Sequence, residues 1–175
     1  LMLGYFYETE LSINFAQITY LNNLLAYKDE LFQYNDHCPV ININRFELRN
    51  FSGTNFRLFQ NSNISFENSY LQGFEGLYGM EVLDSKFIYV SKMTFKDFLR
   101  PGKYGCGLAF YTYDPKLLPI VKIYNSTFSN ISATGGSAIH TNGKHDLYAE
   151  GNLFEDNYAL YSGSVTGIAA AFLGY

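Results

Sequence analysis

Tryptophan is absent from the 175-residue chain, and cysteine, proline and charged residues are scarce. Charged residues make up 16% of the chain, whereas they make up about a quarter of an average soluble domain. A disordered tail needs low hydrophobicity and a high net charge, so the 47% apolar content and net charge of -4 exclude that class. The negative charge, with a pI near 5.3, also excludes the basic footprint of a nucleic-acid-binding domain.

The two cysteines, Cys38 and Cys106, are too few for a disulfide framework and lack the close spacing of metal ligands. Two interpretations stay open, a single long-range disulfide or two buried free thiols, and the second is favoured. No apolar run reaches the roughly 20 residues that span a bilayer as a helix. The first residues lack the regions of a signal peptide and the chain stops on an apolar run, so we expect a fragment of a longer chain.

Phenylalanine, tyrosine and asparagine are abundant, at 16 residues each, and suit half-buried strands and tight turns. An aromatic anchor followed two positions later by Asn or Asp recurs along the chain. The six anchors, spaced by 26, 20, 29, 33 and 26 residues, are Tyr20, Phe46, Phe66, Phe95, Phe128 and Phe154. Leu48 takes the second position after Phe46, and the other five copies hold Asn or Asp there. The pattern therefore predicts a repeat architecture.

Short runs of alternating apolar residues, such as Val121 and Ile123, indicate strands. A period of 20–33 residues suits one coil of a solenoid, in which each strand pairs in parallel with its equivalent one coil later. We expect one all-β domain over residues 1–175 with about six coils. The expected coils lie near 11–35, 36–55, 56–84, 85–119, 120–146 and 147–175. A β-sandwich or jelly roll is the alternative, but it does not predict the recurring aromatic spacing.

The solenoid predicts specific stacks of side chains. We expect Phe66, Phe95, Phe128 and Phe154 to be buried in one stack, and the Asn and Asp positions to form a hydrogen-bonded column at a corner. The longest loop is expected over residues 100–119, which contain three prolines. Near-helical spacing of Leu21, Leu24, Leu25 and Phe32 indicates a short helix between residues 19 and 34.

The segment from Phe128 through Asn130 to Gly135-Gly136-Ser-Ala138-Ile139 resembles the FxxN…GGAI repeats of right-handed parallel β-helix proteins. Phe154-Glu-Asp-Asn157 fits the FxxN half. Such repeats occur in pectin-lyase-like folds, in protist surface proteins and in bacterial autotransporter passengers. The resemblance implies a right-handed parallel β-helix, and it covers residues 121–166 best. It carries almost no information about activity.

Many proteins of this fold cleave acidic polysaccharides, and their activity depends on recognisable catalytic sequence elements. The N-T-D, D-D, G-H-G and R-I-K elements of polygalacturonase-like members are missing from the chain. Asp97 and Asp156 are interpreted as turn-capping residues rather than calcium ligands. Acid–base chemistry at His140 and His145 beside Asp146 is weighed and set aside, as is His37 beside Cys38. We therefore expect no catalytic, cofactor or metal site and no enzyme activity.

Four N-glycosylation sequons begin at Asn50, Asn63, Asn125 and Asn130. Asn63 and Asn125 each lie three residues before an anchor, on the expected turn that leads into the anchor strand. Asn130 falls in the stacked column, where we expect an inward amide that cannot be modified. Asn63 and Asn125 are thus the first candidates, Asn50 the next and Asn130 the last.

The sequence favours a non-enzymatic extracellular or cell-surface module of a fibril, surface coat or appendage. Its expected partners are copies of itself, other structural subunits or glycans, and its terminal coils would expose strand edges. The alternative is an adhesin or a carbohydrate-binding or carbohydrate-cleaving β-helix, in which exposed tyrosines stack on sugars. The tyrosines considered for that role are Tyr111, Tyr113, Tyr158 and Tyr161.

Overall fold

The chain is all-β in the computed structural model, which describes residues 10–19, 23–26, 40–51, 54–58, 63–73, 79–104, 107–160 and 165–167. Every regular element within these ranges is a strand. The strands are β1 (Glu10–Thr19), β2 (Asn23–Ala26), β3 (Val40–Phe51), β4 (Thr54–Leu58), β5 (Asn63–Glu67), β6 (Tyr70–Gly73), β7 (Met80–Leu83), β8 (Phe87–Ser91), β9 (Thr94–Tyr104), β10 (Leu108–Tyr111), β11 (Ile120–Tyr124), β12 (Thr127–Gly135), β13 (Ile139–Asn142), β14 (Asp146–Glu150), β15 (Leu153–Glu155), β16 (Tyr158–Ala159) and β17 (Val165–Gly167).

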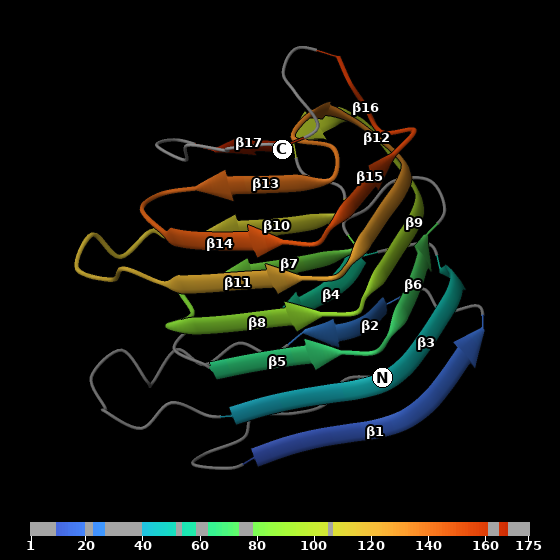
Figure 1. Ribbon diagram of the computed structural model, residues 1–175, viewed down its shortest axis with the longest axis horizontal. Helices are drawn as coiled ribbons and strands as arrows, with labels where there is room; N and C mark the ends of the chain where they lie inside the picture. Colours follow the sequence, from blue (N-terminus) through green and yellow to red (C-terminus); the bar gives the residue numbers. More distant parts are fainter. Residues whose placement is uncertain are drawn as a thin grey trace.

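The strands form two sheets, and every pairing between the described strands is parallel. The larger sheet has 11 strands and the smaller has six, in the order β17-β13-β10-β7-β4-β2. The larger sheet curls, so that β3, β6, β9, β12 and β15 run steeply beside the flatter β5, β8, β11 and β14 (Figure 1). An antiparallel sandwich does not have this topology.

Each pass of the chain crosses the larger sheet, enters the smaller sheet and returns beside the strand from which it started. Strands β8, β9 and β10 make up one such pass, and β11, β12 and β13 make up the next. Equivalent residues pair directly, as Ile88 does with Val121 and Phe95 does with Phe128. Residues that share a position on successive passes therefore form rows across the sheets.

Two bends shape each pass within the larger sheet, and both place a residue in the left-handed backbone region. Asn68, Lys92 and Asn125 occupy the first bend, with φ of 48°, 51° and 49°. The second bend holds Asp97, Asn130 and Asp156, with φ of 57°, 50° and 52°. Asn and Asp tolerate this conformation better than most residues, which explains their recurrence at the second bend, whereas the first bend also places Lys92 and Arg45 there, Arg45 with φ of 54°.

A column of small polar side chains connects the first bends of successive passes. Ser69 Oγ accepts a hydrogen bond from the Phe46 N–H at 2.9 Å, and Ser126 Oγ accepts one from the Met93 N–H at 3.2 Å. Asn152 Oδ1 accepts from the Ser126 N–H at 2.9 Å. These bonds satisfy main-chain donors that the bend takes out of the strand ladder.

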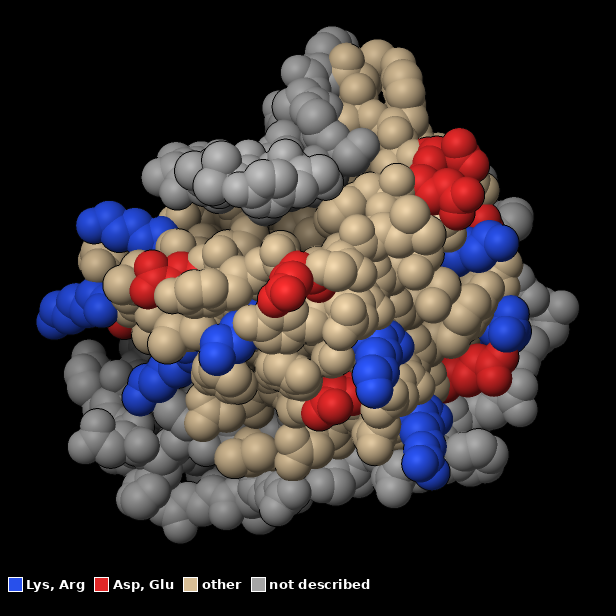
Figure 2. All heavy atoms as spheres, in the orientation of Figure 1, with Lys and Arg blue, Asp and Glu red and all other residues tan. Residues whose placement is uncertain are grey.

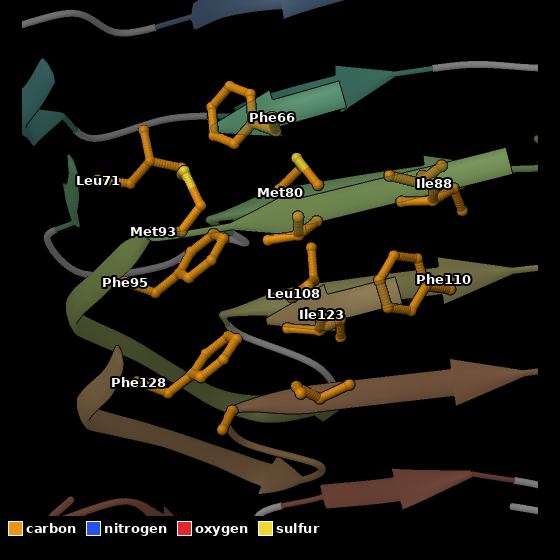
Figure 3. Packing of buried hydrophobic residues seen from close by; sticks show 14 of the residues in the cluster. Phe66, Leu71, Met80, Ile88, Met93, Phe95, Leu108, Phe110, Ile123 and Phe128 are labelled. Carbon is orange, nitrogen blue, oxygen red and sulfur yellow. The ribbon is translucent and has the colours of Figure 1, made fainter. Parts of the chain in front are cut away.

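The expected buried ring stack is confirmed for Phe95 and Phe128 and wrong for the other two residues, since Phe154 joins the stack but is exposed and Phe66 lies in another row. The rings of Phe95 and Phe128 lie 4.9 Å apart at 4°, and those of Phe128 and Phe154 lie 5.2 Å apart at 8°. These distances match the spacing of neighbouring strands, about 4.8 Å. Phe66 is buried on β5, where it pairs with Val90 instead, and Leu71 takes the place expected for it (Figure 3).

The prediction for Phe66 is wrong because the two bends share one local sequence pattern. Phe66 precedes Asn68 at the first bend in the same way that Phe95 precedes Asp97 at the second bend. A search for an aromatic residue two positions before Asn or Asp therefore finds both bends. Phe46 belongs to the first bend too, since its N–H binds Ser69, and Tyr20 lies outside the described residues.

The smaller sheet closes over the core through a row of very small residues that precedes its strands. Gly79, Gly107 and Ala138 stand before Met80, Leu108 and Ile139, which are buried. A Cβ atom at Gly107 would lie 2.5 Å from the Ala138 carbonyl oxygen, and one at Gly79 would lie 2.5 Å from the Gly107 carbonyl oxygen. Small residues are required there because successive passes approach main chain to main chain.

Three other expectations differ from the structure. Residues 100–104 belong to β9, so the loop expected over 100–119 is confined, among the described residues, to 112–119. Asn23–Ala26 form β2 rather than a helix, because parallel pairing with β4 overrides the local spacing. The expected boundary between residues 55 and 56 falls inside β4.

Candidate functional site

The last pass leaves an edge of both sheets uncovered by any described strand. Strand β14 pairs only with β11, β15 only with β12, and β17 only with β13 within the described part of the chain. We call the edge formed by β14, β15 and β17 the open end. Figure 1 shows it at the top of the stack of strands.

Apolar side chains are exposed along the open end. Phe154 is 42% exposed, whereas Phe128, which precedes it in the same row, is 0% exposed. Leu153 is 54% exposed and Tyr158 is 58% exposed. The ring row therefore ends on a face that would become buried if one more strand were added.

Carboxylates surround these apolar residues. Asp146, Glu150, Glu155 and Asp156 are all exposed, and residues 146–160 include no Lys or Arg. Figure 2 shows acidic side chains on the part of this face that β14 and β15 form. The open end is therefore acidic as well as apolar. Charged residues on an edge strand reduce indiscriminate pairing with other chains.

The expected hydrogen-bonded column is confirmed between Asp97 and Asn130, whereas Asn68, expected in the same column, lies at the first bend. Asp97 accepts hydrogen bonds from Gln72 Nε2 at 2.6 Å and from Asn130 Nδ2 at 2.8 Å. Arg49 Nη1 extends the chain of bonds by donating to Gln72 Oε1 at 3.2 Å. Asp156 occupies the same position on the last pass, with the same left-handed backbone.

An aromatic patch covers the outer face of β8, β11 and β14. Tyr89, Lys122 and Tyr148 form one row across the three strands, and Tyr148 is 52% exposed. The rings of Tyr89 and Tyr124 are 6.0 Å apart, and Lys122 Nζ lies 5.8 Å from the Phe87 ring centroid. Sequence analysis missed this patch, although the alternation of outer Phe87, Tyr89 and inner Ile88, Val90 is a signal for it.

The tyrosines expected to stack on sugars are dispersed. Tyr111 and Tyr113 are stacked at 6.0 Å and 10°, next to the smaller sheet, and Tyr113 is exposed. Tyr158 lies on β16 at the open end, and Tyr161 lies outside the described residues. The structure thus brings Tyr111 and Tyr113 together but not Tyr158.

The sequon asparagines lie in different settings. Asn125 is exposed at the first bend, in the row of Asn68, and Asn63 is half-buried at the start of β5, in the row of Phe87. The expected shared register of Asn63 and Asn125 is therefore wrong. The expected inward amide of Asn130 is also wrong, since Asn130 is exposed and bonds to Asp97 outside the core. Asn50 lies on β3, and its side chain lies outside the described set.

His140 and His145 are held by local contacts. His145 Nε2 lies 3.1 Å from Thr112 Oγ1 and its Nδ1 lies 3.1 Å from the Gly143 carbonyl oxygen. Burial lowers the pKa of His145 below its usual value. His140 packs against Tyr111 with ring centroids 5.6 Å apart, whereas His145 packs near Phe110.

The described residues contain no cluster of three or more His, Cys, Asp or Glu side chains that could bind a metal ion. They also contain no helix that is long and apolar enough to cross a membrane. Cys38, Cys106 and His37 lie outside these residues, so the disulfide stays a prediction.

Comparisons with known proteins add no relative. No protein-family model, curated protein or solved structure matches the chain.

Proposed function

We propose that this protein is a non-enzymatic structural module of an extracellular fibril, surface coat or cell appendage. In this proposal, the passes are the coils of a right-handed parallel β-helix. That fold is supported by three features: the parallel rows, the bends whose residues have positive φ, and Asn157, which fits the FxxN pattern. Asn157 bridges two passes, since its Oδ1 accepts from the Ile131 N–H at 3.1 Å and its Nδ2 donates to the Phe128 carbonyl at 2.8 Å.

The open end is the observation that carries the proposal. The ring row ends on the half-exposed Phe154, and β14 and β15 present unpaired parallel edges within the described chain. A solenoid gains stability from each neighbouring coil, so an apolar edge on the last described pass supports continued stacking, either on a further coil of the same chain or on another unit. In this proposal the role of the module is to extend such a stack.

Electron microscopy of the native material tests this function. We expect rods or filaments whose axis runs along the stack of strands. Monodisperse particles that never associate would contradict it. Turnover assays are the complement: we expect no cleavage of pectin, alginate or related polymers, and calcium-dependent release of unsaturated sugars would contradict the non-enzymatic role.

We also propose that the module is secreted and carries N-linked glycan on at least one of Asn63 and Asn125. Asn125 is the better acceptor, because it is exposed at a bend while Asn63 is half-buried. Intact-mass analysis before and after glycosidase treatment measures the modification. Replacing Thr127 with Val removes the Asn125 sequon without altering the left-handed bend, so it should remove one glycan mass from the native protein.

The aromatic patch favours a second candidate function, carbohydrate binding, as in an adhesin. Tyrosine rings present an apolar face with a polar tip, which suits stacking on sugars. The test is a glycan array with the purified protein. Tyr148→Ala should abolish any signal at this patch, whereas Tyr113→Ala, on another face, should leave it unchanged.

A further inference from the structure

We propose that Tyr89 and Tyr124 form an oxidative cross-linking site, at which the two phenol rings are joined into a dityrosine that ties one pass to the next. The inference rests on the proposed extracellular structural function and adds a covalent modification to that role. The oxidant is a peroxidase that uses hydrogen peroxide. The two tyrosines lie on neighbouring strands, Tyr89 on β8 and Tyr124 on β11.

The strand register places the two rings side by side. Tyr89 lies directly opposite Lys122, and Tyr124 follows Lys122 by two residues, so both rings belong to the outer face of the sheet. Diagonal neighbours on adjacent strands are within reach of aromatic side chains. The ring centroids are 6.0 Å apart and the ring planes are inclined at 55°. The fold therefore holds two phenols from different passes as neighbours.

The inclination of the rings favours coupling. The reaction joins the ortho carbons of two phenols, so the edges of the rings must meet. Tyr111 and Tyr113 are equally close, at 6.0 Å, but their planes differ by only 10°. Stacked rings present their faces to each other and have to separate before their edges can meet. Tyr89 and Tyr124 need only rotate about side-chain torsions, while the pairing of β8 with β11 is kept.

The outer face gives the oxidant access to both phenols. Tyr89 and Tyr124 are half-buried, whereas every fully buried ring among the described residues belongs to a phenylalanine. Figure 2 shows the face of β8, β11 and β14 from outside. A tyrosine ring in this position packs its apolar body on the sheet and turns its polar tip to water.

The cross-link forms with balanced atoms and electrons. The peroxidase removes one electron and one proton from each phenol, which leaves two phenoxyl radicals. These two electrons and two protons reduce one hydrogen peroxide to two water molecules. A carbon–carbon bond then forms between the ortho carbons of Tyr89 and Tyr124, and the hydrogen on each of these carbons moves to the oxygen of its own ring. The protein loses two hydrogen atoms and gains one bond.

A cross-link at this position stabilises the stack of passes. Extracellular proteins are commonly tied by disulfides, and this chain has two cysteines but 16 tyrosines. Because Tyr89 and Tyr124 lie on different passes, the new bond closes a long loop in the unfolded chain and lowers the conformational entropy of that state. The cross-linked protein should therefore unfold at a higher urea concentration than the untreated protein.

Peroxidase treatment of the full 175-residue chain tests the site. Dilute protein is treated with a peroxidase and hydrogen peroxide, and the product is analysed by dityrosine fluorescence, intact mass and peptide mapping. We expect a monomer that is lighter by two hydrogen atoms, in which the peptide containing Tyr89 is joined to the peptide containing Tyr124.

Conservative variants identify the two partners. Tyr89→Phe and Tyr124→Phe each keep the ring but remove the phenol oxygen, so each should abolish the joined peptide. Tyr113→Phe and Tyr148→Phe make the same change at exposed tyrosines and are the matched controls, which should leave the joined peptide unchanged. Loss of the joined peptide in either control, or peptides that join other tyrosines but never Tyr89 to Tyr124, would overturn the site.

The native material separates this proposal from the proposed function. The same joined peptide should be present there before any peroxidase is added, and its absence would overturn the modification while leaving the structural function to be judged by electron microscopy. Monodisperse native particles that carry the joined peptide would support the cross-linking site and contradict the structural function.

Discussion

Replacement of Phe128 by alanine tests the central packing feature of the protein. Its ring is fully buried between two parallel rings, with centroids 4.9 Å from Phe95 and 5.2 Å from Phe154. Removing a buried phenylalanine ring costs about 3–5 kcal/mol, because the transfer free energy is lost and a cavity remains. The two lost ring pairs place Phe128→Ala in the upper part of that range.

Two companion variants show whether the loss of unfolding free energy in Phe128→Ala reflects the position of Phe128 in its row of stacked side chains or burial alone. Leu71 and Leu48 occupy the same row on earlier passes, so Phe128→Leu should fit the site and cost only about 1 kcal/mol. Phe154 has one described ring neighbour and is 42% exposed, so Phe154→Ala should cost about half as much as Phe128→Ala.

Urea unfolding followed by circular dichroism measures the three free energies of unfolding. The m-value should stay constant, since the same surface becomes exposed in each variant. A loss below about 1 kcal/mol for Phe128→Ala would place the ring outside the core and refute the packing argument. Equal losses for Phe128→Ala and Phe154→Ala would refute the open end instead.

Three other perturbations follow from single contacts. Gly107→Val should destabilise the fold by about 1–3 kcal/mol in urea unfolding, since its Cβ would lie 2.5 Å from the Ala138 carbonyl oxygen, whereas Gly107→Ala should cost less. Asn157→Ala removes the partner of the Ile131 N–H and of the Phe128 carbonyl oxygen, so it should lower the free energy of unfolding by about 1–3 kcal/mol. An unchanged urea midpoint would refute the role of Asn157 in joining the two passes. Burial lowers the His145 pKa, so the unfolded state binds the proton more tightly and stability should fall as pH drops below about 6.5, the unfolded value. His145→Gln should flatten that slope in a pH series of unfolding midpoints.

The amino-acid sequence by itself determined the class of this fold. Alternation in runs such as Val121 to Ile123 predicts strands, and the recurring Asn and Asp predict sharp bends in the left-handed region, as observed at Asn130 and Asp156. Both features depend on the backbone preferences of a few neighbouring residues. Local physics was therefore sufficient for them.

Only the tertiary structure decided which bend each residue belongs to. Phe66 and Phe95 have the same local pattern, and pairing with Val90 or with Leu71 distinguishes them. The outward position of Asn130, the separate registers of Asn63 and Asn125, and the exposure of Phe154 depend on the neighbouring pass in the same way. A side chain's burial is set by what the adjacent strand places against it, and that strand comes from 20 to 35 residues away in the sequence. No short window contains that information, because the two bends are locally equivalent and only long-range pairing separates them.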